Sequence, residues 1–521
     1  LDIDDRAFQL AYFAIMMKAR QYNRRILNGE YKPNIYSIKE SNGINREHLN
    51  YIGSGCNEDE RNKALEQIGI LLDTFKDAKE YGSILNVEEF DAELLEKFIS
   101  QSEPDGQISM HTVGIEETIQ ELRQIIAVGK VLSEKYHTVV TNPPYMGGSN
   151  MNARLNEFIK KNYADYKSDF FSTFIVHASD MTMPNGFCGF FTPYVWMFIQ
   201  SYEKLRQYLY TESTIETLIQ FEYSAFEEAT VPVCTFTFRN SHITNRKGNY
   251  IRLVDFRGGM EVQRKKTLEA IGNHECGFYY EQSTDNFDKI PGEPVAYWLT
   301  NNSFNAFNNN NILGDLTTAS VGIQTGDNEL FIHLWWEIIY DNICFSAKKK
   351  EDSFQEKKHF PYNKGGEFRK WSGNDYYVVN WQDDGKDVKS NSLSTGHHYQ
   401  QYSDELKFKP LVTWSRITSG LPAFRYKRYG YLSDMAGFCL YSNHIDLRYI
   451  AALCNSIVST YYLQVLAPTL NIMTGQVLAL PFISSQNQNS IIEIVDLCMN
   501  TSRSDWDSYE TSWDFVTHPL I

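Results

Sequence analysis

A short β-branched run in this chain stops at two consecutive prolines. Residues 137–141 read His-Thr-Val-Val-Thr, which predicts a buried strand, and Asn142, Pro143, Pro144 and Tyr145 follow it directly. In doubly wound sheets, where strands alternate with helices, ligands bind beyond the carboxyl ends of the strands. The sequence therefore predicts an α/β domain that presents this tetrapeptide at its ligand-binding edge.

The tetrapeptide offers two hydrogen-bond acceptors in a rigid arrangement. The side-chain oxygen of Asn142 and the carbonyl of Pro143 can each accept one N–H of an exocyclic amine, and the fixed proline φ angles hold the second oxygen in place. This grip directs the nitrogen lone pair of adenine toward a methyl donor. Tyr145 offers a ring face to a base rotated out of the duplex. The alternative is a simple Pro-Pro turn, but chance would place this tetrapeptide in about one such chain in a thousand or fewer.

Hydrophobic spacing predicts further elements around this strand. Residues 5–27 carry apolar residues at helical spacing and follow Leu1–Asp4, which is typical of a strand end. Residues 28–130 are polar and helical in tendency, so we expect them to decorate the sheet as an insertion. A short loop separates the last two of the remaining strands, which predicts an antiparallel pair at the sheet edge. Those strands are expected at residues 187–192, 215–221 and 231–238.

Length and composition bound the domain organisation. At 521 residues the chain is too long for one core, and the alternation of strands and helices fades beyond about Arg239. We expect a first α/β domain at residues 1–245 and a second, mixed α+β domain at residues 246–521. The eight cysteines form no C-x-x-C pair, so we expect neither a metal site nor disulfides, which fits the reducing bacterial cytoplasm. Since the chain begins at Leu1 without a leader, we interpret it as a fragment. No apolar stretch approaches the roughly 18 residues of a membrane span, so no membrane partner is expected.

The charge is unevenly distributed. The net charge of -16 argues at first against nucleic acid, but residues 1–240 hold 23 Lys and Arg against 34 Asp and Glu, whereas residues 241–521 hold 26 against 31. Residues 406–433 contain six basic residues and no acid, interleaved with aromatic residues, which suits phosphate and base contacts. A solvated basic face is the alternative. The candidate DNA contacts in this stretch are Arg416, Arg425, Lys427 and Arg428.

The tetrapeptide and its setting resemble motif IV of the amino-group DNA methyltransferases, in which the form with Asn first is associated mainly with adenine N6. Cytosine N4 stays open as the target. The resemblance implies a Rossmann-like S-adenosylmethionine-dependent domain, whose N-terminal part with the glycine-rich first motif is missing here, followed by a target-recognition domain. A chain without that motif is expected to bind the cofactor weakly or not at all, even if the intact enzyme is active.

The same resemblance implies roles for residues outside the tetrapeptide. Asp2 would bind the ribose hydroxyls of the cofactor, and Ile3 would pack on its adenine. Asp77, followed by Ala78 in the segment similar to the third motif, would accept a hydrogen bond from the adenine amine. Phe226 would pack against the flipped base opposite Tyr145. The alternatives are a helix cap for the first acid, a solvated charge for the second and a core residue for Phe226.

Several later blocks are similar to the PglX family, the large adenine methyltransferases of bacterial phage-exclusion (BREX) systems. That resemblance implies methylation of one strand of a short asymmetric DNA site, with double-stranded DNA and other phage-defence proteins as partners. Related fused restriction-methylation enzymes carry similar blocks, and their nuclease would lie outside this chain, which shows no P-D-x-E-x-K-type cluster. A non-catalytic DNA-binding scaffold is the third reading. The blocks are residues 321–328, 360–366, 413–416, 468–471 and 512–515.

Overall fold

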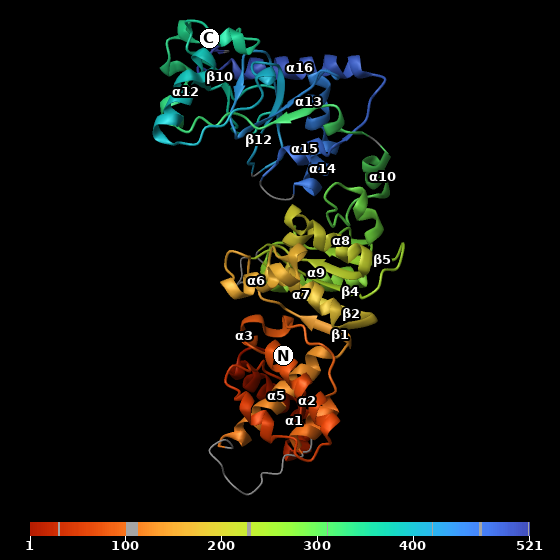
Figure 1. The fold of residues 1–521 in the computed structure, drawn as a ribbon. Helices are drawn as coiled ribbons and strands as arrows, with labels where there is room; N and C mark the ends of the chain where they lie inside the picture. Colours follow the sequence, from red (N-terminus) through yellow and green to blue (C-terminus); the bar gives the residue numbers. More distant parts are fainter. Residues whose placement is uncertain are drawn as a thin grey trace. The chain divides into compact units, whose positions relative to one another are not determined.

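The chain divides into two compact units, Leu1–Asp285 and Asn286–Ile521, each described here by itself (Figure 1). This division falls later than the expected boundary near residue 245, because β5 (Lys247–Arg252) and β6 (Tyr279–Ser283) continue the sheet of the first unit. The computed structural model describes residues 1–29, 32–100, 113–223, 225–226, 231–309, 311–418, 420–467, 471–518 and 520–521. Of the segments singled out above, residues 468–470 and those flanking Phe226 at 224 and 227–230 lie outside this description.

A six-stranded mixed sheet forms the centre of the first unit, in the order β1-β2-β4-β3-β5-β6. The predicted strands are found as β1 (Tyr136–Thr141), β2 (Thr182–Pro193), β3 (Thr214–Gln220) and β4 (Val233–Arg239). The expectation that the first of them is buried is wrong, because β1 lies at the edge of the sheet and none of its residues is buried. Strands β1, β2, β3 and β5 share one direction, whereas β4 is antiparallel to both of its neighbours. The β3–β4 pair is antiparallel as expected, but its predicted place at the edge is wrong, because β2 and β5 flank it.

Helices pack on this sheet and on one another. Helix α7 (Phe170–Asp180) lies against β1 and β2, and α8 (Glu203–Glu212) lies against β3. Nine of the 11 residues of α7 are buried, so this helix lies in the interior of the first unit. The remaining helices here are α6 (Ala153–Asn162) and α9 (Gly259–Gly272).

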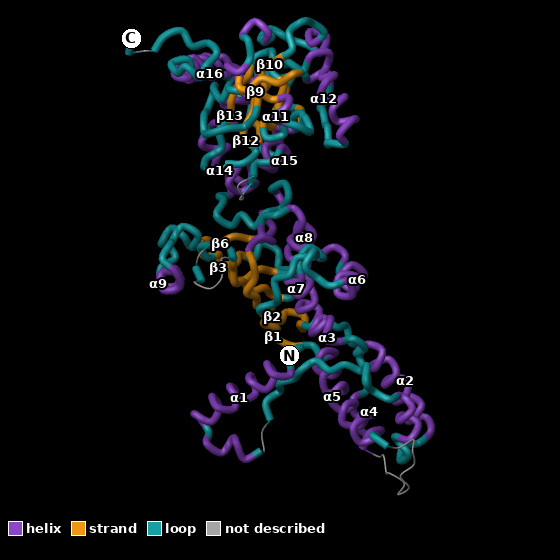
Figure 2. Tube along the Cα trace, turned by 90° about the vertical axis from the view of Figure 1, so that its left-hand side faces the viewer, coloured by secondary structure: helices purple, strands orange, loops and turns teal. Residues whose placement is uncertain are grey.

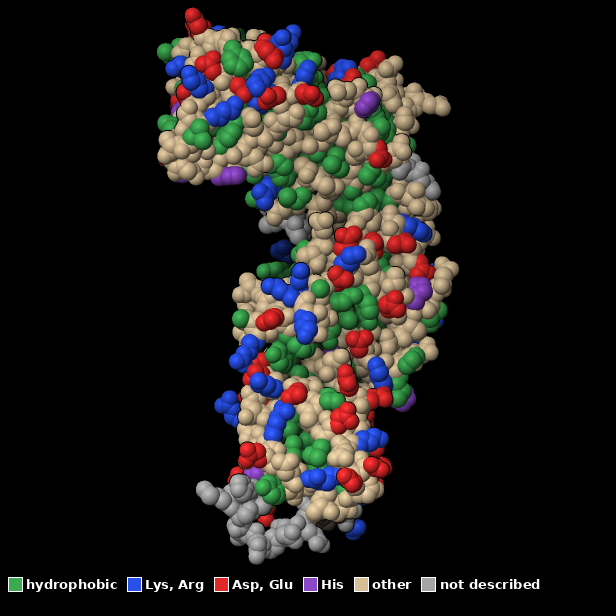
Figure 3. Space-filling view, in the orientation of Figure 1, with side chains coloured by type: hydrophobic (Ala, Val, Ile, Leu, Met, Phe, Trp, Pro, Cys, Tyr) green, Lys and Arg blue, Asp and Glu red, His purple; other side chains and the backbone are tan. Residues whose placement is uncertain are grey.

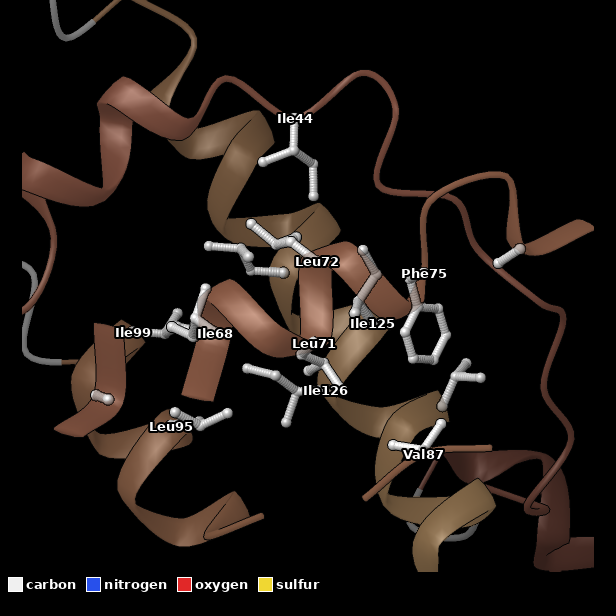
Figure 4. Close-up of a cluster of buried hydrophobic side chains, with 14 of the residues drawn as sticks. Ile44, Ile68, Leu71, Leu72, Phe75, Val87, Leu95, Ile99, Ile125 and Ile126 are labelled. Atoms are coloured by element: carbon white, nitrogen blue, oxygen red, sulfur yellow. The ribbon is translucent and has the colours of Figure 1, made fainter. Parts of the chain in front are cut away.

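The segment expected to decorate the sheet instead has its own hydrophobic core. Side chains of α2, α4 and α5, among them Leu71, Leu95 and Ile125, interlock in this cluster (Figure 4). Helix α1 ends at Tyr22, before the expected residue 27, because a 3-10 turn follows. The N-terminal segment before α1 forms only an isolated bridge from Asp2 to Ser37 and no strand of the sheet. The helices are α1 (Asp5–Tyr22), α2 (Glu58–Thr74), α3 (Ala78–Tyr81), α4 (Ala92–Ser100) and α5 (Ile115–Ser133).

The second unit is α+β, as expected. It contains two four-stranded sheets, β14-β10-β11-β9 and β13-β12-β15-β8, and the pair β16-β7. Figure 2 shows these strands grouped together, with α12 and α16 outside them. Its strands are β7 (Asn311–Ile312), β8 (Thr318–Ser320), β9 (Ile332–Leu334), β10 (His359–Asn363), β11 (Tyr377–Asn380), β12 (Leu411–Ser415), β13 (Phe424–Lys427), β14 (Leu432–Ser433), β15 (Gly437–Tyr441) and β16 (Pro481–Phe482). Its helices are α10 (Asn301–Asn309), α11 (Asn328–Phe331), α12 (Gln382–Thr395), α13 (Leu447–Asn455), α14 (Ile457–Leu466), α15 (Thr474–Leu478) and α16 (Gln488–Trp506).

A buried amide joins the two larger sheets of this unit. The side-chain nitrogen of Asn363 donates to the Thr413 hydroxyl at 2.8 Å and the Ser433 hydroxyl at 3.3 Å. Asn363 and Thr413 belong to two of the blocks noted above, so these blocks build the interior of the unit. Burying an amide is tolerated here because its donors are satisfied.

Within the described ranges, no single helix has the length and apolar character to cross a membrane. Helices α13 and α14, bent by 71° at their junction, meet that test only when taken together.

Two of the predicted DNA contacts lie in the interior of the second unit. Lys427 is 2% exposed, pairs with the Asp375 carboxylate and donates to the Gly373 carbonyl at 2.7 Å. Arg425 is 1% exposed and donates to the Arg369 carbonyl and the Ser415 hydroxyl, both at 3.3 Å. Burial lowers the pKa of both groups, to about 10 for Arg425, and Asp375 opposes the fall. Both cations are therefore part of the interior, where their partners offset the cost of burying them.

Replacing Lys427 with alanine should destabilise the second unit strongly. The change leaves the Asp375 carboxylate, whose side chain is only 13% exposed, without its cation, which costs about 3–5 kcal/mol of unfolding free energy. Urea denaturation measures the loss, with Arg428→Ala as the control because that side chain is 54% exposed and its pairing with Asp514 is long, at 3.6 Å. Equal stability of the two variants would contradict a structural role for Lys427, and a second change, Asp375→Leu, should restore part of the loss.

Candidate active site

The carboxyl ends of β1 and β2 bring the predicted tetrapeptide to one edge of the sheet. Thr141, the last residue of β1, pairs with Phe190 of β2. Asn142 then leaves the strand with its side chain exposed, and Pro143 is buried beneath it. No hydrogen bond to the Pro143 carbonyl oxygen is found in the part of the chain that the structure describes. Both residues that carry the expected acceptors thus lie on the loop that follows the edge strand β1.

The hydroxyl of Tyr145 ties this loop to the neighbouring strand. It lies 3.0 Å from the side-chain oxygen of Asn142 and 3.1 Å from the carbonyl oxygen of Phe191. A phenol has one proton, so it can donate fully to only one of these acceptors at a time. Burial raises the pKa of Tyr145 to about 12, with a smaller contribution from Cys234, so the hydroxyl stays protonated at neutral pH. The side chain is still 39% exposed, which leaves part of it open to a ligand.

An aromatic cluster adjoins the tetrapeptide. The ring of Phe226 packs edge-on against Phe191 at 5.4 Å and against Phe221 at 5.7 Å. Since the Phe191 carbonyl accepts from Tyr145, the structure brings Phe226 to the same end of the sheet as the tetrapeptide. Phe226 is half-buried.

Residues at the start of α7 contact the tetrapeptide and Met146, the residue that follows it. These contacts were not predicted from the sequence. Phe171 meets the Tyr145 ring edge-on at 6.5 Å, and Asp169 accepts a hydrogen bond from the Met146 N–H at 2.9 Å. The available signal was an aspartate just ahead of an apolar helical run, which indicates an N-cap and nothing more. Its contact with a loop more than 20 residues earlier appears only in the fold.

The residues expected at the cofactor lie in a second group. Asp2 is exposed and accepts a hydrogen bond from the Asp4 N–H at 2.9 Å, and Ile3 is 50% exposed. Asp4, not Asp2, caps α1 by accepting from the Arg6 N–H at 2.8 Å, so Asp2 is not a helix cap. A Cβ at Gly82 would come within 3.1 Å of Ile3, so Ile3 lies against the turn after α3.

Asp77 and Ala78 fit the cofactor less well. The Asp77 carboxylate accepts a hydrogen bond from Asn42 at 2.7 Å and forms an ion pair with Arg154 at 3.0 Å. The hydrogen bond from Asn42 has the largest effect on the pKa of Asp77, and both partners lower it. Ala78 is fully buried, and its N–H donates to Phe75. Asp77 also lines an open cleft. The cleft also includes Tyr81, Phe158, Lys161, Tyr163 and Asp180.

The two groups are linked through packed side chains. Ile84, which ends the turn that begins at Gly82, belongs to a hydrophobic cluster that also contacts Met146, directly after the tetrapeptide. Met146 therefore shares this small core with the turn against which Ile3 lies.

The other two predicted DNA contacts, Arg416 and Arg428, differ in solvent exposure. Arg428 is exposed, whereas Arg416 is half-buried and its Nε is buried without a hydrogen-bond partner. Figure 3 shows Lys and Arg intermixed with acidic side chains on the visible face of the second unit. Of the four predicted DNA contacts, Arg428 is exposed, Arg416 is half-buried, and Arg425 and Lys427 are buried.

Comparisons with known proteins agree with this geometry. Residues 1–226 match the family described as Eco57I restriction-modification methylase. The chain is 35% identical over 533 residues to the adenine-specific methyltransferase PglX of Lacticaseibacillus casei (strain Zhang), and 32% identical over 552 residues to the adenine-specific methyltransferase BrxX of Escherichia coli O9:H4 (strain HS). Both matches cover 100% of this chain and 43% of the relative.

A more distant match covers part of the chain. The type II restriction enzyme and methyltransferase RM.Eco57I of Escherichia coli is 22% identical over 289 residues, which cover 53% of this chain and 26% of that protein. The chain thus spans less than half the length of the relatives that it matches. Along its whole length it is a homologue of the adenine-specific methyltransferases PglX and BrxX, so the resemblance expected from the sequence is confirmed.

Proposed function

We propose that the protein containing this chain is a site-specific DNA methyltransferase that transfers a methyl group from S-adenosylmethionine to N6 of a flipped-out adenine. The observation that carries the proposal is the pair of acceptor-bearing residues, the exposed Asn142 and the buried Pro143, at the carboxyl edge of the sheet beside Tyr145. Homology to adenine-specific methyltransferases along the full chain supports it. We place its action on host DNA in the bacterial cytoplasm, together with other phage-defence proteins.

The proposed mechanism uses the acceptors to activate the amine. The two N–H groups of the adenine amine donate to the Asn142 side-chain oxygen and the Pro143 carbonyl, which directs the nitrogen lone pair outward. The Tyr145 hydroxyl then donates to the Phe191 carbonyl alone, and its ring stacks on the base. S-adenosylmethionine supplies an electrophilic methyl group. The nitrogen–carbon bond forms as the sulfur–carbon bond breaks, and the amine proton passes to solvent.

We assign cofactor binding first to Asp2 and Ile3. An exposed carboxylate suits the paired hydroxyls of a ribose, and the uncovered face of Ile3 suits an adenine ring. Asp77 would add an acceptor for the cofactor adenine from its cleft. The buried N–H of Ala78 is already used, so Ala78 would contribute only shape.

The target grip predicts the effect of removing Asn142. In the intact protein, Asn142→Ala should lower the methylation rate by about 100-fold or more, because one of two preorganised acceptors is lost. Mass spectrometry of N6-methyladenine and N4-methylcytosine in digested duplex DNA measures the rate and separates the two target bases. Full activity of a folded Asn142→Ala protein would contradict the mechanism. The control is Asn57→Ala, which removes a helix cap at α2 and should leave the rate unchanged.

The cofactor assignment predicts weaker binding after loss of the Asp2 carboxylate. Asp2→Ala should reduce S-adenosylmethionine affinity in the intact protein by about 10-fold, which corresponds to one or two charged hydrogen bonds. Isothermal titration calorimetry measures the affinity, and Asp59→Ala, an exposed acid at the start of α2, serves as the control. Unchanged affinity in Asp2→Ala would remove this residue from the site.

The basic surface predicts a sequence-independent contribution to DNA binding. Arg428→Ala should weaken binding to all duplexes by a similar factor and reduce the salt dependence by about one released counterion. Fluorescence anisotropy at several salt concentrations measures both effects. Arg264→Ala is the matched control, an exposed arginine on α9 of the first unit. A loss confined to one DNA sequence would instead indicate that Arg428 reads a base.

A fused restriction-methylation enzyme is the second candidate. The name of the relative RM.Eco57I, which combines both activities, favours it. Magnesium-dependent cleavage of unmethylated DNA by the intact protein would identify this case. A non-catalytic DNA-binding scaffold would instead bind duplex DNA and leave it unmethylated.

A further inference from the structure

Asp169 connects α7 to the residue that follows the tetrapeptide. Its Oδ1 accepts from the Met146 N–H at 2.9 Å and, as the N-cap of α7, from the Phe171 N–H at 3.3 Å. The backbone adds a second connection, because the Phe170 N–H donates to the Met146 carbonyl at 2.9 Å and Gly147 forms a bridge with Asp169. One carboxylate oxygen therefore fixes both the start of a buried helix and the end of the tetrapeptide loop.

The same helical turn also supports the ring of Tyr145. Phe171 is fully buried, meets the Tyr145 ring edge-on at 6.5 Å and stacks on Tyr202 at 5.5 Å. Because Phe171 packs against Tyr145 on one side and Tyr202 on the other, it has few alternative rotamers. The position of Phe171 therefore restricts the position of the Tyr145 ring. The first turn of α7 thus holds the loop through its backbone and through the aromatic ring.

We propose that Asp169 is a positioning residue for the target base, which sets the place of the Asn142–Tyr145 loop by holding the Met146 N–H. This inference rests on the proposed function and extends it to a residue outside the tetrapeptide. Asp169 touches neither the base nor the cofactor in this assignment. Its effect is on the geometry of the acceptors and of the stacking ring, where a displacement of about 1 Å is costly to the rate.

The role requires an acceptor oxygen, and the charge is dispensable. Over the described residues, burial and backbone N–H groups shift the pKa of Asp169, and no Lys, Arg or His contributes. Burial raises the pKa of its carboxyl group, and the N–H groups of Met146, Phe171 and Phe170 oppose the rise. An amide oxygen at the same place can accept the same two hydrogen bonds without the cost of burying a charge. Asparagine is therefore the conservative replacement.

Three substitutions in the intact protein separate loop positioning from helix capping. Asp169→Asn keeps both hydrogen bonds and should retain kcat within about 3-fold. Asp169→Ser keeps a good N-cap for α7, but its hydroxyl is shorter and does not reach Met146, so kcat should fall by about 10- to 100-fold at nearly unchanged stability. Asp169→Ala loses both contacts and should lower kcat and the melting temperature together.

Steady-state methylation, a melting curve and 2-aminopurine fluorescence at the target position provide the measurements. We expect the Ser variant to bind DNA and cofactor normally but to show altered fluorescence of the extruded base, because the stacking ring is displaced. The capping control is Asn57→Ala, which should lower the melting temperature without changing kcat.

Two outcomes overturn different claims. Wild-type kcat in the Ser and Ala variants, together with an inactive Asn142→Ala protein, would reject the role of Asp169 and leave the proposed function standing. A wild-type protein that methylates no DNA would reject the proposed function itself. A loss of kcat in Asp169→Asn equal to that in Asp169→Ala would show that the charge acts, against the positioning role.

Discussion

The parallel pairing of β1 with β2 is the interaction on which the rest of the candidate site depends. It places Thr141, the last residue of β1, opposite Phe190 of β2. Phe191 follows Phe190 on β2, and its carbonyl oxygen accepts the hydrogen bond from the Tyr145 hydroxyl. A slip of one residue would turn every side chain of β1 to the other face and move the tetrapeptide away from that carbonyl. The register therefore determines the position of the two acceptors, and the first turn of α7 secures it from the buried side.

The site could be predicted from sequence where one local pattern was sufficient. A β-branched run ended by two prolines located the strand, the loop and both acceptors, because proline stops a strand wherever the surrounding fold places it. The place of β4 inside the sheet could not be predicted in this way. Its neighbour β5 begins only at Lys247, beyond the expected boundary, and pairing between distant strands leaves no mark on local periodicity. Asp169 was missed for the same reason, since its contact with Met146 depends on the tertiary fold.

The basic stretch of the second unit shows a different limit. Arg425 and Lys427 lie two residues apart on β13 and point to the same face, which here is the interior. Their sequence neighbours suggested a DNA-binding surface, but inside the unit Lys427 binds Asp375 and the Gly373 carbonyl, and Arg425 donates to the Arg369 carbonyl. Composition records that a cation is present, whereas only the fold decides whether it faces solvent. Arg428, the next residue after the strand, is exposed because the chain turns there.

The hydroxyl of Tyr145 forms a hydrogen bond with the Asn142 side chain before any base binds. In its absence, the Asn142 oxygen would be free to turn toward solvent or toward other donors on the loop. With it, the oxygen already accepts one hydrogen bond at 3.0 Å, and an alternative acceptor waits at 3.1 Å on Phe191. On the proposed mechanism, an incoming amine exchanges one hydrogen bond for another instead of creating an unsatisfied hydroxyl, so the desolvation cost of base entry is reduced. A phenylalanine could stack equally well, but it could not make this exchange.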